Sequence, residues 1–130
     1  MTTKSDLLKQ KSAINFTHNF RIINLDYLME LSMGDVKFQK ELTNQFIELS
    51  ISETDQLNLY FETAEYHKIQ PLAHSMLSTI YIMGLGPKLE SHLQELKDYS
   101  QPDQLKRHIN IISDVCREAR VEAEIFLETL

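Results

Sequence analysis

The residue with the clearest potential for chemistry in this sequence is His74, in the middle of a predicted helical segment. An imidazole titrates near neutral pH and is a good nucleophile when neutral, so an exposed one can accept a phosphoryl group. Ser78 follows one helical turn later, and its small side chain leaves room for a partner's active site. At steps of three or four residues, the same helix face carries His67, Gln70, Leu77, Ser78 and Tyr81. Taken alone, this spacing is more typical of an ordinary solvated histidine.

Other kinds of chemistry find less support. His67 and His74 are seven residues apart, too far to bind one metal ion together, and His18, His92 and His108 lack carboxylate or cysteine neighbours at ligand spacing. We therefore interpret these three histidines as solvated or core-edge residues. The sequence has no Gly-rich phosphate loop, no cysteine pair, no Gly-x-Ser-x-Gly elbow and no Glu-x-x-His pair. No metal or other cofactor is expected in the chain itself.

Helical periodicity predicts the elements that position His74. Asn24 and Asp35 are N-cap candidates, Pro71 fits the first turn of a helix, and Gly84 is typical of a helix end. The predicted helices are Leu25–Met29 after Asn24, a long helix from Asp35 to about Thr63, Ile69–Met83, Pro87–Tyr99, and Leu105–Leu130 after Pro102.

Each long helix has an apolar face. In the predicted helix from Asp35 to about Thr63, the apolar face comprises Phe38, Leu42, Phe46, Leu49, Leu57, Tyr60 and Ala64, and Glu53 interrupts it. In the predicted helix Ile69–Met83, it comprises Leu72, Ala73, Met76, Ile80 and Met83. In the predicted helix Pro87–Tyr99, the apolar face comprises Leu89, Leu93 and Leu96. In the predicted helix Leu105–Leu130, it comprises Leu105, Ile109, Ile112, Cys116, Ala119, Ala123, Phe126 and Leu130. The acidic residues around 118–128 are interpreted as a solvated face. This pattern predicts an all-α fold, an antiparallel four-helix bundle with a short additional N-terminal helix. Residues 1–20 would form an N-terminal tail or short helix, and residues 21–130 the bundle.

Composition limits the classes of function. The 130 residues are 42% hydrophobic and 25% charged, as in globular domains, and three glycines and three prolines are too few for an all-β protein. The net charge of −6, without a cluster of Lys and Arg, argues against nucleic-acid binding. No apolar run is long enough to span a membrane, and residues 1–10 lack the apolar core of a signal peptide. The single cysteine, Cys116, fits a buried position in a reducing compartment. We expect a cytoplasmic monomer.

The stretch from Leu72 to Gly84 resembles the signature of histidine phosphotransfer (HPt) domains. In that family an Ala-His pair is followed by a small residue at the fourth position after the His and by Gly at the tenth, here Ala73-His74, Ser78 and Gly84. The residues 28–35 are similar to the short helix and Gly-Asp turn that precede the family's long helix. Further similarity lies in Gln45-Phe46-Ile47 and in Leu89, Leu93 and Leu96. The resemblance extends over residues 24–99, and the final helix agrees only in type.

The resemblance implies a function. His74 would take a phosphoryl group from the phospho-aspartate of a receiver domain, in a response regulator or hybrid histidine kinase, and pass it to another receiver. Such a domain is a phosphotransfer intermediate of a two-component phosphorelay, not a turnover enzyme. It holds no metal or nucleotide, because the receiver supplies Mg²⁺. Gln70, Leu77, Ser78 and Tyr81 would surround the site and dock the receiver.

Leu77 departs from the family pattern, which has Lys three residues after the histidine. The loss of that cation should shorten the life of the phosphorylated state or slow transfer without abolishing it, since an exposed charge pair is commonly worth about 0–1 kcal/mol. An exposed Leu would also extend an apolar docking surface. Two alternatives therefore stay open: a non-catalytic HPt-like interaction module that binds a receiver or kinase, and an unrelated helical adaptor.

Overall fold

The computed structural model describes residues 20–97 and 101–130, and over these residues the protein is all-helical, without strands. The elements are α2 (Asp26–Ser32), α3 (Val36–Glu62), the 3₁₀ helix η2 (Tyr66–Lys68), α4 (Ile69–Ile82), α5 (Gly86–Glu95) and α6 (Pro102–Glu128). The all-α prediction is confirmed, and these bounds lie close to the predicted ones. The predicted tail or helix over residues 1–20, apart from Phe20, and the predicted helix end at Tyr99 lie outside the described residues.

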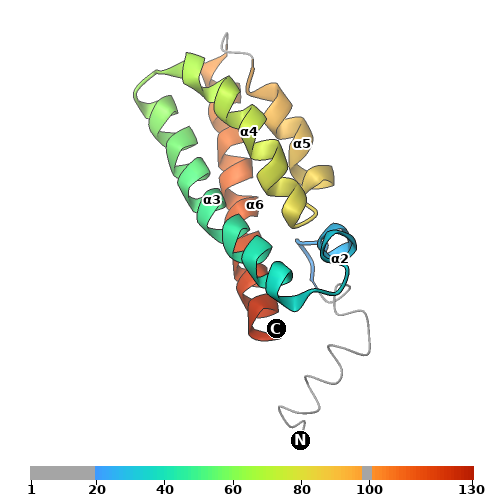
Figure 1. Ribbon diagram of the computed structural model, residues 1–130. Helices are drawn as coiled ribbons and strands as arrows, with labels where there is room; N and C mark the ends of the chain where they lie inside the picture. Colours follow the sequence, from blue (N-terminus) through green and yellow to red (C-terminus); the bar gives the residue numbers. More distant parts are fainter. Residues whose placement is uncertain (1–19, 98–100) are drawn as a thin grey trace, which may run out of the picture.

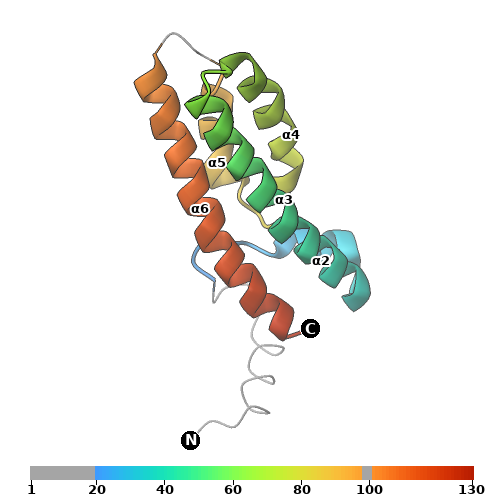
Figure 2. The ribbon, with the colours of Figure 1, turned by 90° about the vertical axis from the view of Figure 1, so that its left-hand side faces the viewer.

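The four longer helices lie side by side along one common direction (Figures 1 and 2). α3 packs against α4 and α6, and α5 also packs against α4 and α6, so each of the four has two neighbours among the others. The short helix α2 contacts α3 and α4 at the end of the molecule where α4 finishes. The core is formed by buried residues of α3, α4, α5 and α6 together with Ile23, Leu25 and Leu28 from the segment around α2.

The predicted apolar faces of α5 and α6 are confirmed. Leu89, Leu93 and Leu96 of the α5 segment are buried. In α6 every predicted core residue is buried except Leu130, which is half-buried just beyond the helix end. Cys116 is among the buried residues, and burial raises the pKa of its thiol to about 11, so the thiol stays protonated at neutral pH.

The predicted apolar face of α3 is only partly right. Phe46 and Leu57 are buried, but Phe38 and Leu49 are each 36% exposed, and Ala64 lies beyond the helix end. The buried face of α3 instead includes polar residues: Gln39, Thr43, Ser50 and Thr54. Helical backbone carbonyls make this possible, because the hydroxyls of Thr43 and Thr54 donate to the carbonyls of the residues four positions earlier, at 2.7 Å in both cases. Hydropathy could not predict this buried face, because short hydroxyl side chains can form their hydrogen bonds with backbone carbonyls of the same helix.

The caps show how the sequence sets helix ends. Asp35 is the N-cap of α3, as predicted, and its Oδ1 accepts from the Phe38 amide at 3.2 Å. The prediction for Asn24 is off by one residue: Leu25 occupies the N-cap of α2, while Asn24 Oδ1 accepts from the Asp26 amide at 2.9 Å. Gly84 follows α4 with φ +68°, and a Cβ there would collide with the backbone of Asn24. Glycine is therefore required where α4 ends against the segment before α2.

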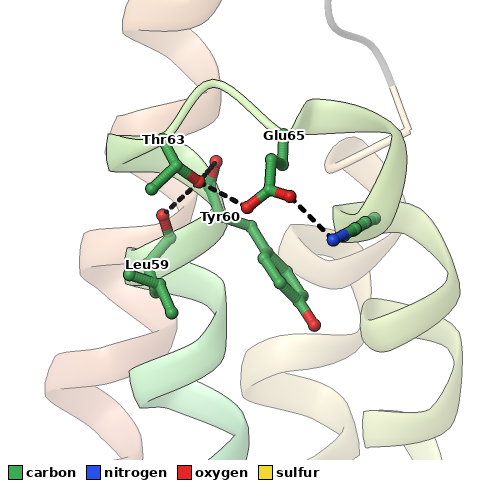
Figure 3. A network of polar contacts seen from close by, with 5 residues as sticks. Leu59, Tyr60, Thr63 and Glu65 are labelled. Atoms are coloured by element: carbon green, nitrogen blue, oxygen red, sulfur yellow. Dashed lines mark hydrogen bonds and ion pairs between the residues drawn. The ribbon is translucent and has the colours of Figure 1, made fainter.

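A polar network shapes the turn between α3 and α4, just before the helix that carries His74 (Figure 3). The Thr63 hydroxyl donates to Glu65 Oε2 at 2.7 Å, and Lys68 Nζ donates to Glu65 Oε1 at the same distance. The bond from Lys68 lowers the pKa of the Glu65 carboxyl, with a smaller contribution from Thr63. The network closes the turn in which Ala64 adopts φ +57°.

The segment before α2 is attached to α6 through one carboxylate. Glu122 accepts from three consecutive backbone amides, those of Arg21 at 3.2 Å and of Ile22 and Ile23 at 2.9 Å. The segment lies beside α6 in Figure 2. The expectation of a simple solvated face over residues 118–128 is thus wrong for Glu122, because its carboxylate satisfies amides of a segment about a hundred residues away in the chain.

Candidate functional site

The predicted site borders a hollow of about 380 Å³ between α4 and α5. On the α4 side it is lined by Gln70, Ala73, His74 and Leu77. On the α5 side it is lined by Leu93, Gln94 and Lys97. The two helices are direct neighbours, as Figure 1 shows. The hollow is therefore lined by apolar, polar and charged side chains.

His74 is exposed in the middle of α4, as predicted. Its neighbours Ala73 and Met76 are buried, which anchors the helix and leaves the imidazole on the outer side. A side chain in this position can meet a partner without any change in the helices. Gln70, one turn earlier, is exposed on the same face.

Leu77 is half-buried and not fully exposed. It packs against the core and lines the hollow beside His74. Its side chain is thus shared between the protein interior and the floor of the site. The expectation that Leu77 extends an exposed docking surface is only partly met, because much of its apolar area is already covered by the protein.

Ser78 and Tyr81 lie outside this hollow. Ser78 is exposed, and its hydroxyl donates to the backbone carbonyl of Ser75 at 3.1 Å. Tyr81 lines a second, more apolar hollow together with Tyr27, Gly84, Gly86, Pro87 and Glu90. The structure thus brings Gln70, His74 and Leu77 together and places Ser78 and Tyr81 further along the same helix.

Tyr81 is held in place by the start of α5. A Cβ at Gly86 would clash with the Tyr81 ring, so glycine permits the ring to lie against the first turn of α5. The Tyr81 hydroxyl donates to the carboxylate of Glu90, and this hydrogen bond raises the pKa of the phenol. Tyr81 is therefore an oriented aromatic side chain, 39% exposed, on the His74 face of the molecule.

The sequence did not predict two further residues at the site: Gln94 of α5, and Lys97, which lies in the turn just after α5. Their signal is weak: they lie one and four residues after the buried Leu93, which places them at the edge of the apolar face of α5. Helical periodicity predicts that edge but not which part of α4 lies opposite. Of the described residues that line the hollow, none is acidic, and Lys97 is the one with a positive charge.

Two histidines far apart in the sequence, His92 and His108, contact each other in the structure. Nδ1 of His92 on α5 lies 2.9 Å from Nδ1 of His108 on α6, with ring centroids 5.2 Å apart. Burial lowers the pKa of His92, and the charges of His108 and Arg107 lower it further. Both side chains are half-buried, which agrees with the interpretation as core-edge residues, but the sequence did not predict that they contact each other. Within the described residues, no group of three or more His, Cys, Asp or Glu could hold a metal ion.

Comparison with known proteins gives no match: no family model matches the sequence, and neither a curated protein nor a solved structure matches the chain. In the parts of the chain that the structure describes, no helix combines the length and apolar character needed to cross a membrane.

Proposed function

We propose that this protein is a histidine phosphotransfer domain of a phosphorelay, with His74 as the phosphoryl acceptor. The observation that carries the proposal is an exposed imidazole in the middle of a helix whose opposite side is buried, next to a hollow that contains a lysine and two glutamines. A neutral imidazole can attack a phosphoryl group there, and the adjacent polar groups can contact the phosphoryl oxygens.

The chemistry of the proposed step is a single in-line displacement. One ring nitrogen of His74 supplies the electron pair for a new N–P bond, while the P–O bond of a receiver's phospho-aspartate breaks and leaves its electrons on the carboxylate. Mg²⁺ in the receiver would offset charge on the phosphoryl oxygens. This protein's part is to hold His74 where the partner can reach it, because correct positioning supplies much of the rate.

The proposal extends to the architecture and the partner. We assign the four long helices to an antiparallel four-helix bundle, supported by the short connections between successive helices and by the two neighbours that each helix has. The expected partner is the receiver domain of a response regulator or hybrid histidine kinase, which binds a monomer of this protein in the cytoplasm. In this proposal Gln70 and Leu77 flank the acceptor, and Ser78 and Tyr81 lie in the docking surface.

Transfer of labelled phosphate tests the proposal. Receiver domains charged with ³²P-acetyl phosphate are mixed with the purified chain, and protein-bound label is followed over time. A phosphoryl group on an imidazole is a phosphoramidate, so the label should be lost in acid and survive in base. Label should be absent from His74→Gln, while circular dichroism shows unchanged helicity, because the exposed side chain contributes little to the core.

His67→Gln is the matched control, since His67 is an exposed histidine on η2 and does not line the hollow. It should accept label as wild type does. Label that persists in His74→Gln would show that the acceptor has been assigned wrongly.

The alternative is an interaction module that binds a receiver without phosphotransfer. The observation that favours it is the more apolar hollow formed by Tyr27, Tyr81 and the start of α5, which can bind a partner without any reaction at His74. A wild-type chain that binds a receiver but takes no label from it would establish this alternative.

A further inference from the structure

We propose that Lys97 is the cation that holds a phosphoryl group carried by His74. The inference rests on the proposed function, because it concerns the phosphorylated state of the same site. It assigns to a residue just after α5 the role that the family pattern gives to a lysine at position 77 of the His74 helix, where this sequence has Leu77.

The first support is geometric. His74 lines the hollow from α4, Gln94 lines it from α5, and Lys97 lines it from the turn just after α5. Leu93 is buried in the core, and the Lys97 amide donates to the carbonyl of Gln94 at 3.5 Å, so the end of α5 positions Lys97. Lysine has a flexible four-carbon stem with three donors on its ammonium group, which suits a ligand that arrives only after transfer.

The second support is the charge around the hollow. The protein carries a net charge of −6, yet none of the described residues that line this hollow is acidic. Lys68, the nearest lysine before α4 in the sequence, is paired with Glu65 at 2.7 Å. Lys88 is exposed in the first turn of α5 and does not line the hollow. Among the described residues that line the hollow, Lys97 is the one that can offer a positive charge to an anion bound at His74.

The third support is the chemistry of hydrolysis. In the loose transition state of phosphoryl transfer, negative charge moves from the peripheral phosphoryl oxygens toward the leaving group. An ammonium group beside those oxygens therefore stabilises the phosphorylated ground state more than the transition state. Loss of the nitrogen–phosphorus bond to water should be slower when Lys97 is present.

The lifetime of chemically phosphorylated protein tests the inference without a receiver. The full chain is treated with potassium phosphoramidate, which transfers its phosphoryl group to imidazole and releases ammonia. The ³¹P NMR signal absent from His74→Gln identifies phospho-His74, and its decay is followed after the donor is removed. Lys97→Gln should shorten the half-life about two- to five-fold, the range expected for one exposed charge pair.

Four comparisons separate a charge effect from a structural one. Lys88→Gln on α5 should leave the half-life unchanged, and Lys97→Arg should keep most of the wild-type value. Added salt should shorten the half-life of wild type but not that of Lys97→Gln. Leu77→Lys should lengthen the half-life more in the Lys97→Gln background than in wild type, because the two cations would serve the same oxygens.

The outcomes for Lys97 and for the proposed function are distinguishable. Equal half-lives of wild type and Lys97→Gln overturn the inference, even if His74 accepts label from a receiver. A shorter half-life in Lys97→Gln supports it, even if no tested receiver transfers label. If phosphoramidate leaves His74 unmodified in both proteins, the hollow does not hold a phosphoryl group and the inference is wrong.

Discussion

At the scale of single residues, the His74 face combines reactivity with access. His74 and Ser78 are both exposed one turn apart on α4, and the Ser78 hydroxyl is already occupied by the carbonyl of Ser75. Ser78 therefore offers a docking partner a small, internally satisfied surface. A larger side chain there would occupy space next to the imidazole that the proposed receiver would need.

Replacement of Ser78 by Gln tests this space. We expect the label transferred from a receiver to appear at least about tenfold more slowly, since misplacement of reacting groups by about 1 Å can cost far more. The melting temperature should change little, because the position is exposed. Ser91→Gln, at an exposed serine on α5 that does not line the hollow, serves as the control for rate and stability. Unchanged transfer in Ser78→Gln would show that the receiver docks elsewhere.

At the scale of helices, the packing of α3 contains one ionisable group with poor solvation. Glu53 is half-buried on α3, and its Oε1 is buried without a hydrogen-bond partner in the described part of the protein. Burial raises the pKa of this carboxyl, and a hydrogen bond from Thr79 of α4 offsets part of the increase. The residue that interrupts the apolar face of α3 in the sequence is thus a site of energetic cost in the fold.

The raised pKa of Glu53 makes stability depend on pH in a defined direction. Above the folded-state pKa the unfolded chain accommodates the charge better, so this residue lowers stability, and the loss disappears as pH falls toward the ordinary value of 4.5. Glu53→Gln should raise the free energy of unfolding at pH 7 by less than about 1 kcal/mol, because solvent screens part of the charge on this half-buried side chain. The difference from wild type should shrink near pH 4 in urea titrations.

The exposed Glu48 of the same helix provides the control for Glu53. Glu48→Gln should leave the free energy of unfolding nearly unchanged across this pH range. A Glu53→Gln protein that is less stable than wild type at pH 7 would mean that its carboxylate has a partner essential to packing.

At the scale of the whole molecule, contacts between residues distant in the sequence join separate helices and segments. The Glu122 carboxylate joins residues 21–23 to α6, and the His92–His108 contact joins α5 to α6. Both contacts involve polar groups that local sequence patterns treat as surface residues.

Removal of the Glu122 carboxylate should destabilise the fold. Glu122→Ala leaves the amides of residues 21–23 without their shared acceptor, and unsatisfied donors of this kind cost about 1–3 kcal/mol. Hydrogen exchange of the Ile22 and Ile23 amides should accelerate as well. Glu118→Ala, at an exposed glutamate one turn earlier, should change neither quantity. Slow exchange of these amides in Glu122→Ala would contradict the proposed role of the carboxylate.

The His92–His108 contact predicts a loss of stability in acid. The pKa of His92 is lowered from 6.5, mainly by burial, so below that pH the unfolded state binds more protons than the folded state. Stability should therefore fall as pH decreases from 6.5 through the folded-state pKa of His92. His92→Gln should flatten this part of the curve measured by thermal unfolding, while His67→Gln should not. A His92→Gln curve parallel to that of wild type would contradict the assignment.

The sequence alone determined the helical segments, because apolar residues at steps of three and four residues and capping residues such as Asp35 act locally. It also determined that His74 faces outward, since Ala73, Met76 and Ile80 define the buried side of the same helix. The buried face of α3 was less predictable, because it contains polar residues. The hydroxyls of Thr43 and Thr54 can be buried there since they donate to backbone carbonyls of the same helix.

Only the tertiary structure decided what lies opposite His74. The relative placement of α4 and α5 depends on how their side chains interlock, which periodicity along one helix does not contain. That packing brings Gln94 and Lys97 to the hollow beside His74, and similar packing brings His92 to His108. The exposed position of His74 could therefore be predicted from residue order, whereas the charged group beside it depends on the packing of two helices.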